Sequence, residues 1–205
     1  MKQDILSSFE RFNCQTKKVD KLANMLTGIV NASICSFNGS IFKFGGFEET
    51  INQKTSISNS IVKYDLKFNR WTNLSLQLSL NKYQLTLLST SASLQINENE
   101  IIVVGGYHED NSGSDQTFIA QVNKPQNSQE NETVVIKDLN LRRLPFGEGF
   151  WNNNPFIQEG KAFFMQNKSG ERDDICLEDD RTVLVLDKDE WNIVNQSGRE
   201  DLMRI

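Results

Sequence analysis

Two segments of this chain, Ser40-Ile-Phe-Lys-Phe-Gly-Gly46 and Glu100-Ile-Ile-Val-Val-Gly-Gly106, decide its fold. Each is a short run of β-branched and aromatic residues that ends on two glycines, which is typical of a buried strand followed by a turn. The two runs lie 60 residues apart, and a further 60 residues lead to the apolar run Gly160-Lys-Ala-Phe-Phe-Met-Gln166. A strand that recurs at a fixed spacing predicts a fold built from repeated units.

Strand patterns occur along the whole chain, whereas helix patterns are nearly absent. Residues 18–30 come closest to helical spacing, and a short helix there is the one exception that we consider. Further β-branched or aromatic runs, bounded by turn-forming residues, lie at 60–64, 133–137, 161–165 and 182–186. We therefore expect an all-β protein.

The first repeat carries two more features with a physical role. Tyr64 and Trp71 follow its apolar run after a variable loop, and their large side chains can bury roughly 150–250 Å² each between neighbouring sheets. The glycines Gly45 and Gly46 allow a positive φ and a close backbone approach where any Cβ would clash.

This pattern resembles the kelch repeat, in which a Gly-Gly pair closes a strand and a Tyr and a Trp follow about seven positions apart. The second repeat keeps Gly105 and Gly106 but has Val122-Asn123 in place of Tyr-Asp, and the third loses the glycine pair but ends on Leu186-Asp187 and Trp191. Near the N-terminus, Phe12-Asn13 and Val19 reproduce the spacing of the Tyr and the Trp.

The resemblance implies a kelch-type β-propeller, with blades of four-stranded antiparallel sheet arranged radially. We assign residues 1–26 to the closing strands of a preceding blade, 27–80, 81–141 and 142–198 to three blades, and 199–205 to a tail. Propellers usually have about four to eight blades, so we expect an incomplete ring that belongs to a longer propeller, or that a second copy or another chain completes. An unrelated antiparallel sandwich is the alternative.

Charge and composition exclude several classes of protein. The 22 basic and 27 acidic residues give a net charge of -5, which argues against broad binding to nucleic acid or to an anionic membrane. No apolar run approaches the roughly 18–20 residues of a membrane span, and the N-terminus lacks a signal-like apolar stretch. We expect a cytoplasmic protein, with cytoskeletal association as one option. Three distant cysteines without a CxxC motif predict neither disulfides nor a zinc site.

The single histidine, His108, limits the catalytic options. Sites that need two or more imidazoles, including the copper site of some kelch-like oxidases, cannot be built from one copy of this chain. No GxSxG surrounds a serine and no GxxxxGK[ST] is present, so neither the nucleophile elbow of α/β-hydrolases nor a P-loop is indicated. We predict no catalytic, metal or cofactor residues. A propeller-type enzyme acting on a sugar or small metabolite remains the alternative.

The resemblance assigns partner binding to two sets of loops at one end of the blades. The B–C loops, which join the second and third strands of each blade, are expected at 47–58, 107–117 and 167–180. The third contains an acidic cluster that suits a basic partner segment, or is simply solvated. The connections between blades place basic residues beside aromatic ones, as at interface hot spots, unless the aromatics pack between blades. The partner-binding candidates are Lys82, Tyr83, Arg142, Arg143, Phe146, Asp173, Asp174, Asp179 and Asp180.

The leading hypothesis from the sequence is a non-enzymatic interaction module, a scaffold or adaptor whose loops hold another protein. The family suggests a ubiquitin-ligase or cytoskeletal component as that partner. No BTB-like helical region accompanies the repeats, so the process is left open.

Overall fold

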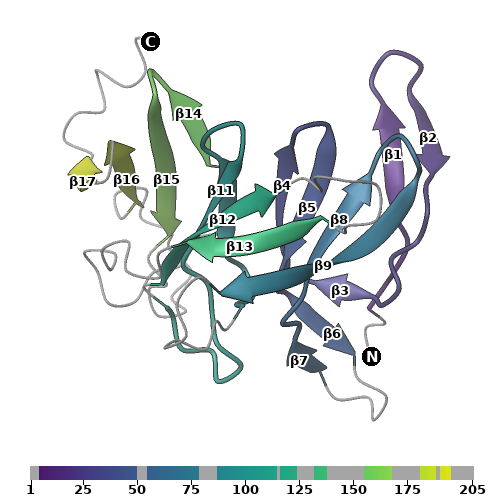
Figure 1. Cartoon of the computed structure of the whole chain (residues 1–205), viewed down its shortest axis with the longest axis horizontal. Helices are drawn as coiled ribbons and strands as arrows, with labels where there is room; N and C mark the ends of the chain where they lie inside the picture. Colours follow the sequence, from purple (N-terminus) through teal and green to yellow (C-terminus); the bar gives the residue numbers. More distant parts are fainter. Residues whose placement is uncertain are drawn as a thin grey trace, which may run out of the picture.

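The computed structural model describes residues 5–49, 55–78, 87–114, 116–123, 132–137, 155–167, 181–187 and 190–194. All the regular secondary structure in these ranges is β-strand, so the expected all-β class is confirmed (Figure 1). The short helix considered for residues 18–30 is not present there, where β2 (Lys18–Lys21) and β3 (Ile29–Val30) lie instead. Within the described ranges, no helix has the length and apolar character to cross a membrane.

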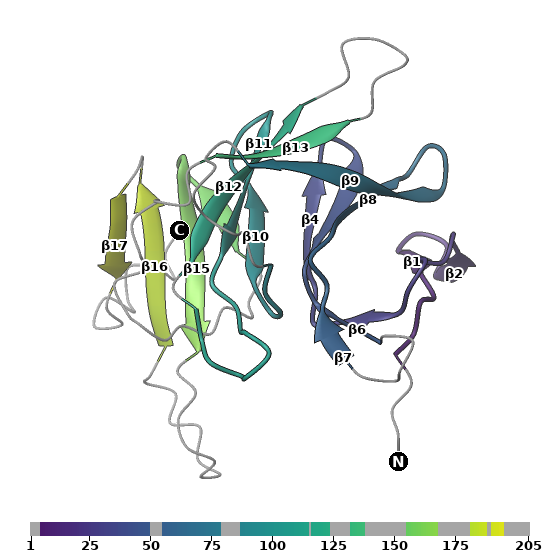
Figure 2. The ribbon, with the colours of Figure 1, turned by 60° about the horizontal axis from the view of Figure 1, so that its bottom comes forward.

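Three units of four neighbouring antiparallel strands make up most of the structure. The first blade contains β4 (Ser33–Phe37), β5 (Ser40–Phe44), β8 (Ile61–Asp65) and β9 (Arg70–Leu78). The second contains β10 (Ala92–Gln95), β11 (Glu100–Val104), β12 (Thr117–Asn123) and β13 (Thr133–Lys137). The third contains β14 (Phe156–Gln158), β15 (Lys161–Asn167), β16 (Arg181–Asp187) and β17 (Glu190–Val194). The three apolar runs spaced 60 residues apart are thus the second strands of successive blades, β5, β11 and β15. The three blades follow one another across Figure 2.

The second blade shows why these runs are apolar at consecutive positions. Ile101 and Val103 belong to the core shared with the first blade, while Ile102 and Val104 belong to a separate core with Phe164 of the third blade. Successive side chains of a strand point to opposite faces. Both faces of the second blade are therefore buried, and the blades are held together by packing on either side of it.

The first two blades also share hydrogen bonds at their last strands, a feature that the sequence did not indicate. The first half of β9 pairs antiparallel with β8, from Arg70 to Leu74, and its second half pairs parallel with β13, from Ser75 to Leu78. This joins the two blades into one eight-stranded sheet. The join is possible because β9 has nine residues and extends beyond the five residues of β8.

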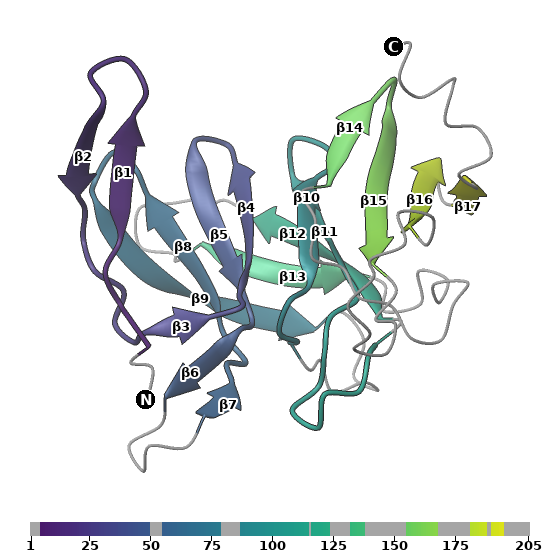
Figure 3. The ribbon, with the colours of Figure 1, turned by 180° about the vertical axis from the view of Figure 1, so that it is seen from behind.

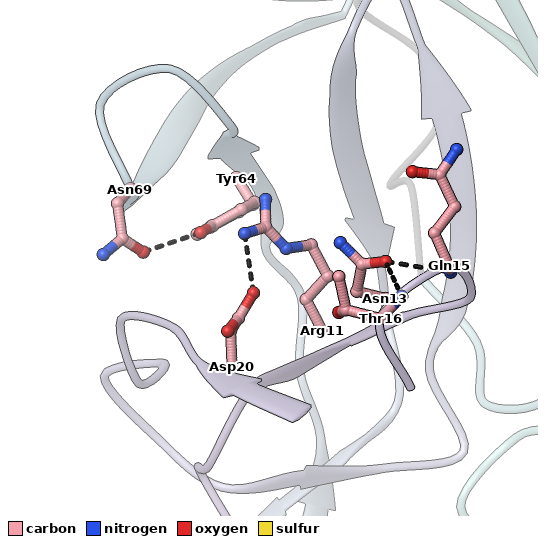
Figure 4. A network of polar contacts seen from close by, with 7 residues as sticks. All are labelled: Arg11, Asn13, Gln15, Thr16, Asp20, Tyr64 and Asn69. Carbon is pink, nitrogen blue, oxygen red and sulfur yellow. Dashed lines mark hydrogen bonds and ion pairs between the residues drawn. The ribbon is translucent and has the colours of Figure 1, made fainter. Parts of the chain in front are cut away.

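A hairpin of β1 (Glu10–Asn13) and β2 precedes the first blade and repeats the geometry of its last two strands. Phe12 pairs with Val19 in register, as Tyr64 pairs with Trp71. The turns also correspond. The Asn13 side chain accepts the N–H groups of the residues two and three positions on (Figure 4), and the Asp65 side chain does the same in its own turn. The same turn chemistry therefore closes both hairpins.

Part of the first B–C loop is itself folded. β6 (Phe47–Glu49) and β7 (Thr55–Ile57) pair with each other, and β6 also pairs with β3 (Figure 3). This small three-stranded sheet fixes the loop against the segment that leads into the first blade.

Candidate functional site

The first glycine pair brings the connection between the first two blades close to the end of β5. Gly45 and Gly46 have φ values of 57° and 87°, which residues with a side chain rarely adopt. A Cβ on Gly45 would lie 2.0 Å from the carbonyl oxygen of Leu88, which accepts the N–H of Gly46 at 3.2 Å. Only glycine allows the connection to pass this close.

The second glycine pair holds the other side of the same connection. Ser89 and Tyr107 exchange backbone hydrogen bonds of 3.1 and 2.9 Å, and a Cβ on Gly106 would lie 2.6 Å from the carbonyl oxygen of Ser89. The connection therefore lies between the starts of two B–C loops, and the positive φ and close backbone approach that the glycine pairs predict are both present.

Side chains link the loops of the two blades further. The Glu109 carboxylate accepts the N–H of Ile57 at 2.9 Å, across the boundary between the second and first blades. The Asn59 side-chain oxygen accepts the N–H of Leu87 at 3.3 Å. Contacts of this kind restrict the conformational freedom of the loops on this surface.

These contacts surround a cavity of about 540 Å³ on the loop face. Its lining residues come from the B–C loops, the segment just before the third strand and the connection between blades: Ile57, Asn59, Leu87, His108, Glu109, Asp110 and Ser112. We call this set the loop-face cavity. Hydrogen bonds from the Ser112 hydroxyl and from the Ser112 backbone N–H lower the pKa of Asp110. The two carboxylates of the loop-face cavity, those of Glu109 and Asp110, suit a cationic group.

The loop-face cavity gives only limited support to a catalytic function. The Ser112 hydroxyl donates to Asp110 Oδ1 at 2.5 Å, and no hydrogen bond joins it to the His108 imidazole among the contacts of the described residues. A serine nucleophile needs a base in hydrogen-bond contact. Within the described part of the chain, no group of three metal-ligating side chains is present either.

The predicted partner-binding residues lie outside the described residues: Lys82, Tyr83, Arg142, Arg143, Phe146, Asp173, Asp174, Asp179 and Asp180. The repeat positions are placed. Tyr64 is fully buried and its ring packs 4.9 Å from that of Trp71, while Trp191 pairs in register with Leu186. Phe9 covers both Tyr64 and Trp71, with ring distances of 4.8 and 5.1 Å.

A second cavity, lined in part by Lys43, Glu48 and Trp71, was missed from the sequence. The sequence does contain an indication of this cavity, because Lys43 is the only charged residue in the otherwise uncharged run Ser40-Ile-Phe-Lys-Phe-Gly-Gly46. Period-two alternation places it on the face opposite to Phe42 and Phe44.

Comparisons with known proteins agree with this architecture. Residues 29–75 match a family model described as the kelch motif. No curated protein matches the chain. The solved structure of YjhT is similar with a TM-score of 0.62 and 15% sequence identity, over 92% of this chain and 59% of that one. This chain therefore spans less than two thirds of that structure. Residues 29–75 form a kelch repeat, and the fold of the chain is that of kelch-type propeller blades.

Proposed function

We propose that this chain is a protein-interaction module that binds a basic segment of a partner protein at the loop-face cavity. The observation that carries the proposal is the pair of carboxylates, Glu109 and Asp110, on the second B–C loop, which a hydrogen bond joins to the first B–C loop across two blades. A preformed acidic surface on a rigid frame favours association with a cationic segment and costs little ordering.

The remainder of the predicted interface fits the same proposal. Asp173, Asp174, Asp179 and Asp180 belong to the third B–C loop, and would add negative charge to the same end of the blades. Lys82, Tyr83, Arg142, Arg143 and Phe146 would supply hot-spot contacts from the connections between blades. A cytoplasmic adaptor or scaffold of the ubiquitin-ligase or cytoskeletal systems is the broader role that we propose.

A charge-reversal experiment tests this function. Binding of a lysine- and arginine-rich peptide is measured at two salt concentrations with the wild type and with Glu109→Lys plus Asp110→Lys. We expect binding that weakens with salt and falls at least about tenfold in the double variant, since like charges then face each other. The control is Glu98→Lys plus Glu159→Lys, which makes the same change of charge in turns at the other end of the blades.

Equal binding by the two double variants would contradict the proposal. A sugar or small metabolite that raises the melting temperature, with no peptide binding, would instead favour the propeller-type enzyme.

A further inference from the structure

Lys43 lies in the middle of β5 with only 3% of its surface exposed. Its Nζ donates hydrogen bonds to Ser60 Oγ at 3.1 Å and to Ser58 Oγ at 3.4 Å, and the two hydroxyls lie 2.7 Å from each other. Hydroxyls carry no charge, and no ion pair to Lys43 occurs in the described part of the chain. A buried ammonium without an ion-pair contact is costly.

A cavity of about 270 Å³ adjoins this lysine, between the first blade and the segment that contains β3. Its polar lining includes Lys43, Ser60 and Glu48, and its apolar lining includes Ile29, Val62 and Trp71. Pockets for drug-sized ligands are roughly 300–1,000 Å³, so an occupant of this cavity is small.

We propose that this cavity binds a small carboxylic acid with a short apolar chain. The carboxylate pairs with the Lys43 ammonium, and the chain packs against Ile29, Val62 and Trp71. The site lies on the other face of β5 from the core shared by the first two blades, and it shares no lining residue with the loop-face cavity.

The electrostatics of Lys43 agree with an anionic occupant. Burial lowers the pKa of Lys43 to about 8, and the Glu48 carboxylate opposes this effect without overcoming it. At neutral pH the ammonium form therefore still predominates. A bound carboxylate in direct contact with the ammonium adds to the attraction of Glu48 and raises that pKa further.

Glu48 allows a second test of the proposal, in which the expected change in binding has the opposite sign to that for Lys43. Its carboxylate accepts a hydrogen bond from the Thr27 hydroxyl at 3.4 Å and lines the same cavity. A carboxylate ligand is repelled by Glu48 and attracted by Lys43. Removing the charge of Glu48 should therefore strengthen binding at a pH where Lys43 stays protonated, below its pKa of about 8.

The experiment is calorimetric titration at pH 7 with two matched probes, 4-methylpentanoate and its neutral amide. We expect one carboxylate to bind per chain, and the amide to bind at least about tenfold more weakly, because the ion pair is lost. Lys43→Met should weaken carboxylate binding at least about tenfold, and Glu48→Gln should strengthen it severalfold. Lys67→Met is the control, because it makes the same substitution at an exposed turn.

Several outcomes would overturn the proposal. These are no saturable binding of the carboxylate by the wild type, equal binding of the amide, or equal losses from Lys43→Met and Lys67→Met. Because Lys43→Met could alter folding, Glu48→Gln gives an independent readout: weaker carboxylate binding in that variant also counts against the site.

Discussion

The hydroxyl groups of Ser33 and Ser93 lie 2.7 Å apart in the buried interface between the first two blades, and the two residues are one 60-residue period apart. Asn38 and Glu98 repeat the relationship, since the Asn38 side chain donates to the Glu98 carbonyl at 2.8 Å. Both pairs join the first strand of one blade, or its turn, to its equivalent in the next. The first strands of the two blades are therefore joined by side-chain hydrogen bonds, in addition to the backbone pairing of β9 with β13.

The Ser33–Ser93 hydrogen bond should contribute measurably to stability. Ser33→Ala or Ser93→Ala alone leaves one buried hydroxyl without its partner, so each should lower the free energy of unfolding by about 1–3 kcal/mol. The double variant should lose less than the sum of the two, by about 1 kcal/mol. Urea unfolding of the four proteins measures this coupling. Strict additivity would show that the hydrogen bond adds no stability.

The glycine pair of the first repeat should tolerate no side chain. Gly45→Ala places a Cβ 2.0 Å from a backbone oxygen, so the connection between blades must move, and we expect a loss above about 3 kcal/mol. Gly39→Ala is the matched control, because Gly39 also has a positive φ, of 72°, but no atom lies within 4 Å of the added Cβ. It should lose only about 1 kcal/mol, the cost of the backbone conformation. Equal losses in urea unfolding would contradict the contact argument.

Much of the fold was predictable from sequence because local patterns and repeats agree. The apolar runs at 40–46 and 100–106 became the second strands of adjacent blades, and Tyr64 and Trp71 became a packed pair in which Tyr64 is buried and Trp71 is half-buried. These features depend on period-two burial and on glycine conformation, both of which leave a trace in a single sequence.

The remaining features depend on contacts between distant residues. The parallel pairing of Ser75–Leu78 with β13 follows from the length of β9 relative to β8, which no local pattern encodes. The hydrogen bond from Ile57 to Glu109 depends on how two blades lie together. The cavity beside Lys43 needs both the first blade and the segment before it, and so the lysine alone gave no site.

The cysteines should differ sharply in reactivity. Burial raises the pKa of Cys35 to about 11, with a smaller opposing effect from a hydrogen bond to the backbone of Gln95, whereas Cys14 is exposed. The thiolate is the reactive form. At pH 8, iodoacetamide should therefore modify Cys14 and leave Cys35 unmodified until urea is added. Mass spectrometry of tryptic peptides separates the two sites, and equal rates in the folded protein would contradict the burial of Cys35.

Lys43 should give the stability of the protein a distinct pH dependence. Its pKa is about 8 in the folded chain and 10.5 for an ordinary lysine. Between these values the unfolded chain holds a proton that the folded chain does not, so the free energy of unfolding rises with pH across this window. Below pH 8 the folded protein carries the whole cost of the buried charge.

Lys43→Met removes that cost, so the stability of the variant relative to wild type should be greatest below pH 8 and should decrease as the pH approaches 10.5. Urea unfolding at a series of pH values from 7 to 10 measures the difference. Lys67→Met, at an exposed position, should give a difference that changes little with pH. If the Lys43→Met difference is equally constant, the lysine is not destabilised by burial, and the electrostatic support for an anionic ligand beside it is lost.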